Sequence, residues 1–267
     1  MLRLLGLFVL VYVGLIVFYV FAQRGLIYYP QTASAESLLQ NAGSLEAVRD
    51  HSGDIIAWRG GDLNAQQRFL VFHGNAGHAQ HRRYLMELFA ETDPAWEVVV
   101  MEYPGYGSRR GSASETAFFQ AAETLFQQLT QNDERPVYLL GESIGSGPVA
   151  HLAEHHPEAV AGLLLITPFT RLADVGRHHF PWLPVATLLR DRYDNVAALA
   201  DYRGRVAVVT AENDSVVPAK FGRQLYETLS GPSEYFEIPA TDHNNIHYHP
   251  ETDPWQQSVE FLVQESQ

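Results

Sequence analysis

The chain has 267 residues, 46% of them hydrophobic, which is enough for one large α/β domain with a sizeable core. Its 18 basic residues stand against 31 acidic ones, and the resulting formal net charge of −13 disfavours a nucleic-acid partner. The sequence contains no cysteine, which excludes disulfides, zinc–thiolate sites, iron–sulfur clusters and cysteine nucleophiles.

An uncharged, strongly apolar run, Leu4–Ala22, lies between Arg3 and Arg24 near the amino end. As a helix, this run extends roughly 28 Å, which is close to the hydrocarbon thickness of a bilayer. We therefore expect residues 1–29 to form a membrane anchor, with a transmembrane helix over about 4–22. A cleaved signal peptide is the alternative, because the sequence Val-Phe-Ala at 20–22 is similar to a cleavage site.

The charges that flank this run bear on its orientation. The α-amine and Arg3 precede the run and Arg24 follows it, which predicts a cytoplasmic amino terminus and a domain on the non-cytoplasmic side. We expect residues 30–50 to be a tether that leads into a first strand and residues 51–267 to be a self-sufficient domain, so that a chain starting near Gln31 folds without the anchor. Four tyrosines are expected near the membrane interface: Tyr12, Tyr19, Tyr28 and Tyr29.

Short apolar runs alternate with stretches of mixed polarity along the rest of the chain. The runs are typical of strands buried on both faces and cover 68–74, 96–107, 136–143, 161–169 and 205–214, with a last strand at 235–239. The expected helices are Ala79–Ala90, Glu115–Gln131, Ile144–His155 and Phe221–Ser230. Strict alternation predicts an α/β fold with a mostly parallel central sheet, helices on both faces and chemistry at the carboxyl ends of the strands. Residues 171–195 interrupt the alternation, and we expect them to form a small lid-like insertion.

The sequence Gly-Glu-Ser-Ile-Gly at 141–145 lies between a predicted strand and a predicted helix. Glycines flank Ser143 because a sharp turn from strand to helix leaves no room for Cβ atoms, and such a turn exposes the hydroxyl. This context predicts that Ser143 is a nucleophile. A glycine-rich turn without chemistry is the alternative.

A serine nucleophile needs a base that is held by an acid. Asp214 follows the strand at 205–214, and His243 follows the last strand. The order Ser143, Asp214, His243 is the one expected when a triad lies at the ends of successive strands. We therefore predict that His243 is the base and Asp214 the acid.

Other residues compete for these two roles. They are Glu212 and Asp242 for the acid, and His247 and His249 for the base. Glu212 lies nearer the strand end than Asp214. We expect the side chain of Asp242 to point away from the adjacent imidazole.

The sequence His-Gly-Asn-Ala-Gly at 73–77 leaves the strand at 68–74 as a loop of small residues. Its backbone N–H groups are suited to stabilise an oxyanion. We predict that the donors are the backbone N–H groups of Asn75 and Ile144, with Ala76 as the alternative to Asn75. We expect His73 to brace the turn rather than to transfer protons.

Twelve histidines invite a metal interpretation, but the sequence contains no HExxH motif, and we expect no catalytic metal. The sequence Tyr-Pro-Gly-Tyr-Gly at 103–107 lacks both the GxGxxG pattern and a Walker lysine. We therefore expect no nucleotide and no other cofactor.

These residues resemble the α/β-hydrolase superfamily, and the resemblance spans roughly Gly60 to Val263. Together with the apolar amino end, the motifs HGNAG, YPGYG, GESIGSG and NDSVVP are similar to the single-pass branch of serine hydrolases, which includes lysophospholipases, depalmitoylases and serine aminopeptidase-like esterases. The resemblance implies that Ser143 is nucleophile, His243 base and Asp214 acid. Many relatives have glycine where this chain has Asp242, which affects the local turn. Some members of the superfamily use an aspartate nucleophile at the position of Ser143, and their chemistry is therefore disfavoured for this chain.

The sequence thus predicts a membrane-anchored serine hydrolase that cleaves esters or thioesters, acyl lipids included, through an acyl-enzyme. The alternatives are a peptidase of the serine aminopeptidase type and a non-catalytic, membrane-anchored binding protein with this fold. The insertion supplies apolar side chains suited either to an acyl chain or to packing on the sheet: Phe180, Trp182, Leu183, Val185, Leu188 and Leu189. The expected substrate is a small molecule or an acyl lipid.

Overall fold

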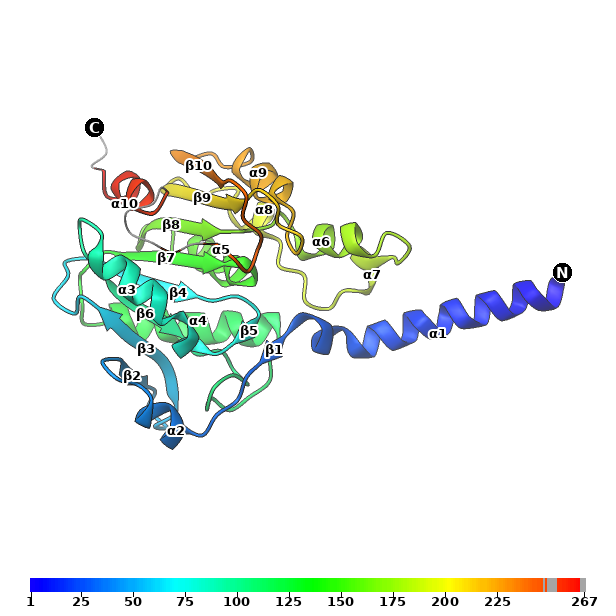
Figure 1. Cartoon of the computed structure of the whole chain (residues 1–267), viewed down its shortest axis with the longest axis horizontal. Coiled ribbons are helices and arrows are strands. Elements are labelled where there is room, and N and C mark those ends of the chain that lie inside the picture. Colours follow the sequence, from blue (N-terminus) through cyan, green and yellow to red (C-terminus); the bar gives the residue numbers. More distant parts are fainter. Residues whose placement is uncertain (247, 249–253, 265–267) are drawn as a thin grey trace.

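The computed structural model describes residues 1–246, 248 and 254–264 (Figure 1). The strands are β1 (Tyr29–Pro30), β2 (Glu46–Arg49), β3 (Ile55–Gly61), β4 (Arg68–Phe72), β5 (Ala76–Gly77), β6 (Glu97–Met101), β7 (Val137–Glu142), β8 (Val160–Ile166), β9 (Arg205–Ala211) and β10 (Ser233–Ile238). The helices are α1 (Leu2–Ile27), α2 (Ala35–Gln40), α3 (Arg83–Glu91), α4 (Glu115–Thr130), α5 (Ser146–His155), α6 (Leu172–His179), α7 (Val185–Leu188), α8 (Asn195–Ala198), α9 (Ala219–Tyr226) and α10 (Trp255–Val263). Two 3₁₀ turns, η1 (Ala79–Arg82) and η2 (Ser143–Gly145), precede α3 and α5.

Eight strands form one sheet in the order β10-β9-β8-β7-β4-β6-β3-β2. All neighbours from β10 to β6 pair in parallel, whereas β3 is antiparallel to β6 and β2 is antiparallel to β3. The prediction of a mostly parallel central sheet in an α/β fold is confirmed. Of the two antiparallel strands at one edge, β3 lies where a first strand was expected after the tether, without bounds, whereas β2 was not among the predicted strands.

The core lies on both faces of the sheet, because successive side chains of a strand point to opposite faces. In β4, for example, Leu70 and Phe72 pack on one face and Phe69 and Val71 on the other. Residues of α4, α5 and α9 belong to the first core, and residues of α2, α3 and α10 belong to the second. Helices therefore cover both faces, and the ends of the parallel strands are left free to carry the site (Figure 1).

The segment 30–50 differs from the expected tether. It contains α2, which is capped by the side chain of Ser34, and it contributes β2 to the edge of the main sheet. Just before it, β1 pairs in parallel with β5, and the side chain of Tyr28 is buried. The folded domain therefore begins before residue 51, and residues 28–30 are packed against it.

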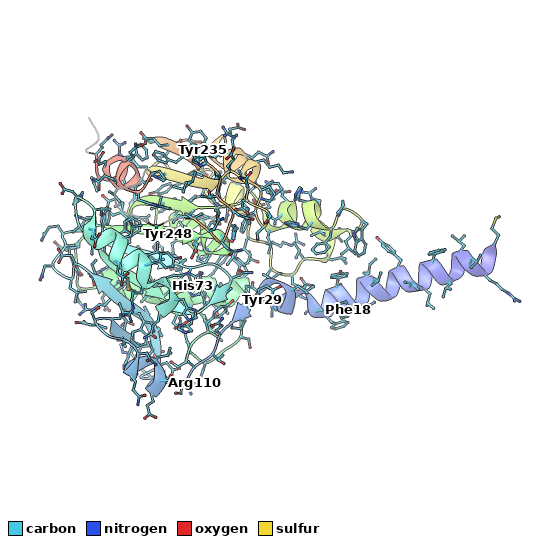
Figure 2. The ribbon with its side chains drawn as sticks, in the orientation of Figure 1. Phe18, Tyr29, His73, Arg110, Tyr235 and Tyr248 are labelled. Atoms are coloured by element: carbon cyan, nitrogen blue, oxygen red, sulfur yellow. The ribbon has the colours of Figure 1, made fainter. Side chains whose placement is uncertain are left out.

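Helix α1 has the length and composition of a membrane span over Arg3–Ile27, and a signal sequence near the amino terminus has the same properties. Most of its apolar side chains are exposed, for example Phe8 and Phe21. Its first turns stand clear of the domain (Figure 2), whereas contacts with the domain begin at Tyr12, whose hydroxyl donates to the carbonyl of Trp182 at 3.0 Å. Its last turns pack beside the segment 171–195.

The segment 171–195 contains α6 and α7 and projects on the same side of the domain as α1 (Figure 1). Its ends are joined, because Arg171 and Asp194 form an antiparallel bridge and their side chains an ion pair of 2.8 Å. Because its ends are joined, the length and sequence of such a segment can vary without disturbing the sheet. We refer to residues 171–195 as the insertion.

Candidate active site

Ser143 lies on a strained turn between β7 and α5. Its φ of 54° falls in the left-handed region, which residues other than glycine adopt rarely. A Cβ on Gly145 would overlap the carbonyl oxygen of Phe72, and a Cβ on Gly141 would lie 2.8 Å from the carbonyl oxygen of Gly145. Both glycines are therefore required by the close approach of backbone segments at this turn.

His243 connects Ser143 to Asp214. Its Nδ1 lies 2.7 Å from Oδ2 of Asp214, and its Nε2 lies 3.1 Å from Oγ of Ser143. Because a carboxylate oxygen can only accept, Nδ1 carries the proton of the neutral ring, and the lone pair on Nε2 faces the hydroxyl. The structure thus brings together the three residues that the sequence selected.

Asp214 is held rigidly in the interior. Its Oδ1 accepts hydrogen bonds from the backbone N–H groups of Val216 at 2.9 Å and Val217 at 2.6 Å, and its side chain has no exposed surface. The second oxygen is left for the imidazole. A fixed carboxylate of this kind orients the ring and favours its charged form.

The two alternative acids lie elsewhere. Glu212 accepts a hydrogen bond from the backbone N–H of Ala240 at 2.7 Å. Asp242 accepts from the N–H of Ser215 at 3.0 Å, and the hydrogen bonds that it accepts lower the pKa of its carboxyl. Asp242 therefore ties the loop of His243 to the loop of Asp214 without contacting the imidazole. The alternative bases, His247 and His249, lie outside the described residues.

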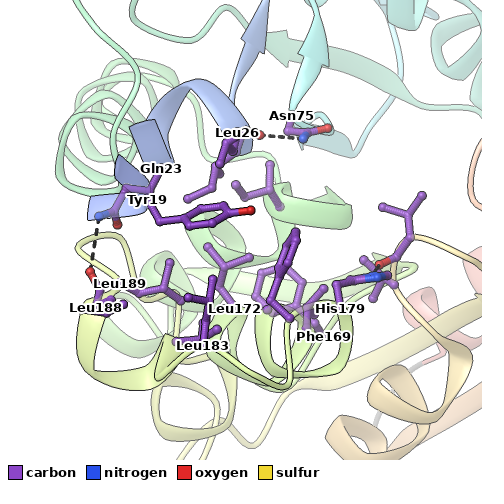
Figure 3. Close-up of a pocket in the computed structure, with 18 of the residues that line it drawn as sticks. Tyr19, Gln23, Leu26, Asn75, Phe169, Leu172, His179, Leu183, Leu188 and Leu189 are labelled. Atoms are coloured by element: carbon purple, nitrogen blue, oxygen red, sulfur yellow. Dashed lines mark hydrogen bonds between the residues drawn. The ribbon is translucent and has the colours of Figure 1, made fainter. Parts of the chain in front are cut away.

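The predicted oxyanion donors border the same space as the serine. Asn75 and Ile144 both line the cavity that contains Ser143. Among the described residues, the backbone N–H of Asn75 donates to no acceptor, whereas its side-chain amide donates to the carbonyl of Ile27 at 2.6 Å. The backbone donor therefore remains free, and the side chain fixes the loop in place (Figure 3).

His73 braces this loop. Its ring is fully buried against Tyr103, its Nδ1 lies 2.8 Å from the carbonyl oxygen of Gly74, and its own carbonyl accepts from the Tyr103 hydroxyl at 2.7 Å. Burial lowers the pKa of His73 well below its usual value, so the ring is neutral.

A charged network beneath the site was not predicted from the sequence. Glu142 accepts hydrogen bonds from Arg82 at 2.8 Å, from the backbone N–H of Gly74 at 3.2 Å and from the hydroxyl of Tyr84 at 3.2 Å. Burial alone would raise the pKa of Glu142, but the charge of Arg82 and these hydrogen bonds lower it. The residue just before Ser143 is therefore an ionised link to the loop that carries Asn75. The sequence signal that could have indicated this network is an acidic residue, Glu142, at the end of an apolar strand.

An apolar cavity of about 240 Å³ extends from Ser143 between the insertion and α1 (Figure 3). Phe180 and Leu183 line it, as do Val185, Leu188 and Leu189. Trp182 does not line the cavity; its ring packs against Tyr19 instead, with centroids 6.0 Å apart. Part of the wall comes from α1, which the sequence did not indicate.

One group of side chains among the described residues could hold a metal ion: Glu123, His151 and His155, on α4 and α5. None of the three lines the cavity of Ser143. The hydrogen-bond partners of Ser143, His243 and Asp214 are one another and the backbone rather than this group. The expectation of a mechanism without a catalytic metal stays a prediction.

Comparisons with known proteins agree with this geometry. The profile of the alpha/beta hydrolase fold family matches residues 67–191. The uncharacterized protein Rv2307c of Mycobacterium tuberculosis is 34% identical over 244 residues, which cover 87% of this chain and 84% of that protein. The lysophosphatidylserine lipase ABHD12 of Danio rerio is 28% identical over 180 residues, which cover 59% of this chain but 46% of the lipase. The chain therefore spans about half the length of that lipase.

Solved structures show the same fold. The esterase PF2001 of Pyrococcus furiosus superimposes with a TM-score of 0.65 at 13% identity, over 89% of this chain and 96% of the esterase. A monoacylglycerol lipase of Paleococcus ferrophilus superimposes with a TM-score of 0.58 at 18% identity, over 79% of this chain and 98% of the lipase. The fold is that of an α/β hydrolase. The chain belongs to the α/β-hydrolase superfamily, and its relatives support a hydrolase of the esterase or lipase type.

Proposed function

We propose that the protein is a serine hydrolase that cleaves carboxylic esters or thioesters through an acyl-enzyme. The single observation that carries this proposal is the chain of contacts from Asp214 through His243 to Ser143, with distances of 2.7 and 3.1 Å. Each residue follows the carboxyl end of a strand, which is where α/β sheets bind ligands. The fold alone would not carry the proposal, because one fold hosts many functions.

In the proposed first step, the oxygen of Ser143 attacks the carbonyl carbon of the ester while its proton passes to Nε2 of His243. The imidazolium that forms is stabilised by the carboxylate of Asp214. Negative charge develops on the carbonyl oxygen, and the backbone N–H groups of Asn75 and Ile144 are the proposed donors to it.

The intermediate then expels the alcohol or thiol, which takes the proton from His243. The acyl group stays on Ser143 as an ester. Water attacks this ester with His243 again as base, and the carboxylic acid leaves while the proton returns to the serine. The ester and one water are the only reactants that the two half-reactions consume, and the chain returns to its starting state.

The lining of the cavity supports an acyl substrate. Apart from Ser143 and a few polar groups such as Gln23 and His179, the side chains that face it are apolar. Such a lining favours burial of a hydrocarbon chain over burial of a peptide, whose backbone groups need hydrogen-bond partners. We therefore favour acyl esters and thioesters over a peptidase function.

The proposal includes anchoring by α1 and a lid role for the insertion. Exposed apolar side chains along α1 support anchoring, and the position of the insertion over the cavity supports the lid role. The flanking charges of α1 favour a catalytic domain on the non-cytoplasmic side.

The test is hydrolysis of p-nitrophenyl esters of graded acyl length by the full chain in detergent. We expect turnover by the parent and a loss of about 10³-fold or more in Ser143→Ala. Ser230→Ala removes an exposed hydroxyl and serves as the matched control, with unchanged turnover. Full activity in Ser143→Ala would contradict the proposal.

Two further outcomes of the same assay favour the alternatives. Turnover of aminoacyl-p-nitroanilides in preference to esters would indicate a peptidase. No turnover of any ester, anilide or thioester by a folded parent protein would indicate a binding protein with a hydrolase fold.

A further inference from the structure

One face of the carboxyl-terminal part of α1 is built into the cavity of Ser143. The residues on this face are Tyr19, Gln23, Leu26 and Ile27, and all four line the cavity (Figure 3). Their spacing of four, three and one residues places them on the same side of a helix with 3.6 residues per turn. Phe21, two residues after the first of them, points away and is 76% exposed.

Polar contacts fix this face against the insertion. The side-chain amide of Gln23 donates to the carbonyl of Leu188 at 3.3 Å and accepts from the backbone N–H of Arg190 at 2.8 Å. Arg24 forms two hydrogen bonds with the buried carboxylate of Asp191, at 3.0 and 3.1 Å. Paired bonds of this kind fix orientation as well as distance. A helix that served only as an anchor would not need to be held in one orientation.

Aromatic side chains of α1 and the insertion lie next to each other. The ring of Tyr19 lies with its centroid 5.9 Å from that of Phe180 and 6.0 Å from that of Trp182. The hydroxyl of Tyr12 donates to the carbonyl of Trp182 at 3.0 Å. Since Tyr12 precedes Tyr19 by about 10 Å of helix, the tip of the insertion runs alongside the part of α1 that has the composition of a membrane span.

This tip is apolar and exposed. Phe180 is 40% exposed and Trp182 is 48% exposed, next to a helix whose own apolar side chains are exposed. Adjacent exposed apolar surfaces of this kind are typical of contact with a membrane. The cavity that contains Ser143 thus lies beside surfaces suited to lipid, because α1 and the insertion both line it.

We infer that α1 is a wall of the acyl-binding site, and that the acyl chain of a membrane-resident ester enters from the lipid phase between α1 and the insertion. The inference rests on the proposed function. A dry cavity of about 150 Å³ holds a benzene-sized ligand, so a cavity of about 240 Å³ suits one acyl chain. Tyr19 and Leu26 are then residues that determine specificity, although they belong to the proposed anchor.

The test compares two substrates of the full chain in phosphatidylcholine vesicles, p-nitrophenyl acetate and p-nitrophenyl dodecanoate. Leu26→Trp places bulk in the cavity wall, and we expect it to lower kcat/KM for the dodecanoate by about tenfold through a higher KM, with the acetate unchanged. Leu10→Trp makes the same change at an exposed position of α1 that does not line the cavity, and both substrates should be unaffected.

A second pair of variants tests whether the effect of Leu26→Trp arises from a disturbed helix rather than from a blocked cavity. Tyr19→Ala removes part of the wall and should raise KM for the dodecanoate, whereas Phe21→Ala should not. Equal losses on both substrates in Leu26→Trp and Tyr19→Ala would show that α1 supports the fold only, and no loss on either would show that the chain binds elsewhere. Either result overturns the inference. Failure of the parent on both substrates would instead refute the proposed function.

Discussion

The side chain of Glu142 accepts a hydrogen bond from the backbone N–H of Gly74, with 3.2 Å between Oε2 and the nitrogen. This bond joins the residue before Ser143 to the residue before Asn75, so the proposed nucleophile and a proposed oxyanion donor are positioned by one carboxylate. Arg82, 2.8 Å from the same oxygen, supplies the compensating charge. Hydrogen bonds and charge on Glu142 therefore position the proposed site, in addition to the contacts within the proposed triad.

Glu142→Gln should lower kcat by about tenfold or more while leaving KM within about twofold. The amide loses the charge that pairs with Arg82 and weakens the bond that holds the Gly74 loop, but it fills the same space. Steady-state kinetics on a soluble short-chain ester give the two constants separately. Glu237→Gln, which changes an ion pair at the surface with Arg223, is the control. A change in KM alone would show that Glu142 does not position the proposed oxyanion donors.

Asp214→Asn should lower kcat/KM by about 10³- to 10⁴-fold, because an amide neither holds the imidazole in the required tautomer nor stabilises its charge. Glu212→Gln should change kcat/KM by less than about threefold, since the side chain of Glu212 contacts the backbone of Ala240 and not the imidazole. Parallel kinetics of the two variants check this. A larger loss in Glu212→Gln would move the role of the acid to Glu212.

The proposed triad residues could be selected from the sequence because each lies at a strand end that the sequence marks. Ser143 lies between glycines after an apolar run, and Asp214 and His243 follow later strands in the expected order. Such local signals require only that the strands be parallel and adjacent. The roles of these residues stay predictions until activity is measured.

Contacts between segments that are far apart in the chain are not marked by any local sequence pattern of this kind. In α1, Tyr19 and Gln23 lie in a helix that is apolar on nearly every side, so no periodicity marks the face that meets the insertion. Of the tyrosines expected at a membrane interface, Tyr28 is buried in the domain, where its hydroxyl lies 2.9 Å from that of Tyr193. Trp182 was expected in the substrate site, but its ring packs on α1, because the path of the insertion depends on a helix more than 150 residues earlier.

The bounds of the antiparallel edge strands could not be predicted for a similar reason. Residues 55–61 form β3, but this run ends in two glycines and pairs with β6 across more than 35 residues of chain. Short strands of this kind are defined by their neighbours rather than by their own composition. The segment 46–49 is a strand only because β3 lies beside it.

Stability should fall with rising pH because of Glu102. Burial raises the pKa of its carboxyl from 4.5 to about 7, and the hydrogen bond from the N–H of Ala79 opposes this only in part. Between these two pH values the folded state keeps a proton that the unfolded chain has released, so the free energy of unfolding decreases as pH rises from about 4.5 to 7.

Glu102→Gln retains an acceptor for the N–H of Ala79 and removes this titration. We expect its thermal midpoint to match that of the parent near pH 4.5 and to exceed it by a few degrees at pH 8. Thermal unfolding across this pH range is the measurement. If the midpoints of the two proteins ran parallel at all pH values, the carboxyl of Glu102 would not be the titrating group.

The most direct test of the account is covalent labelling of the full chain with a fluorophosphonate, followed by mapping of the modified residue by mass spectrometry. An activated hydroxyl beside oxyanion donors reacts quickly, whereas an ordinary serine does not. The geometry of Ser143, with Nε2 of His243 at 3.1 Å, predicts modification at Ser143 alone and none in Ser143→Ala. Labelling of another serine, or labelling that persists in Ser143→Ala, would contradict the account.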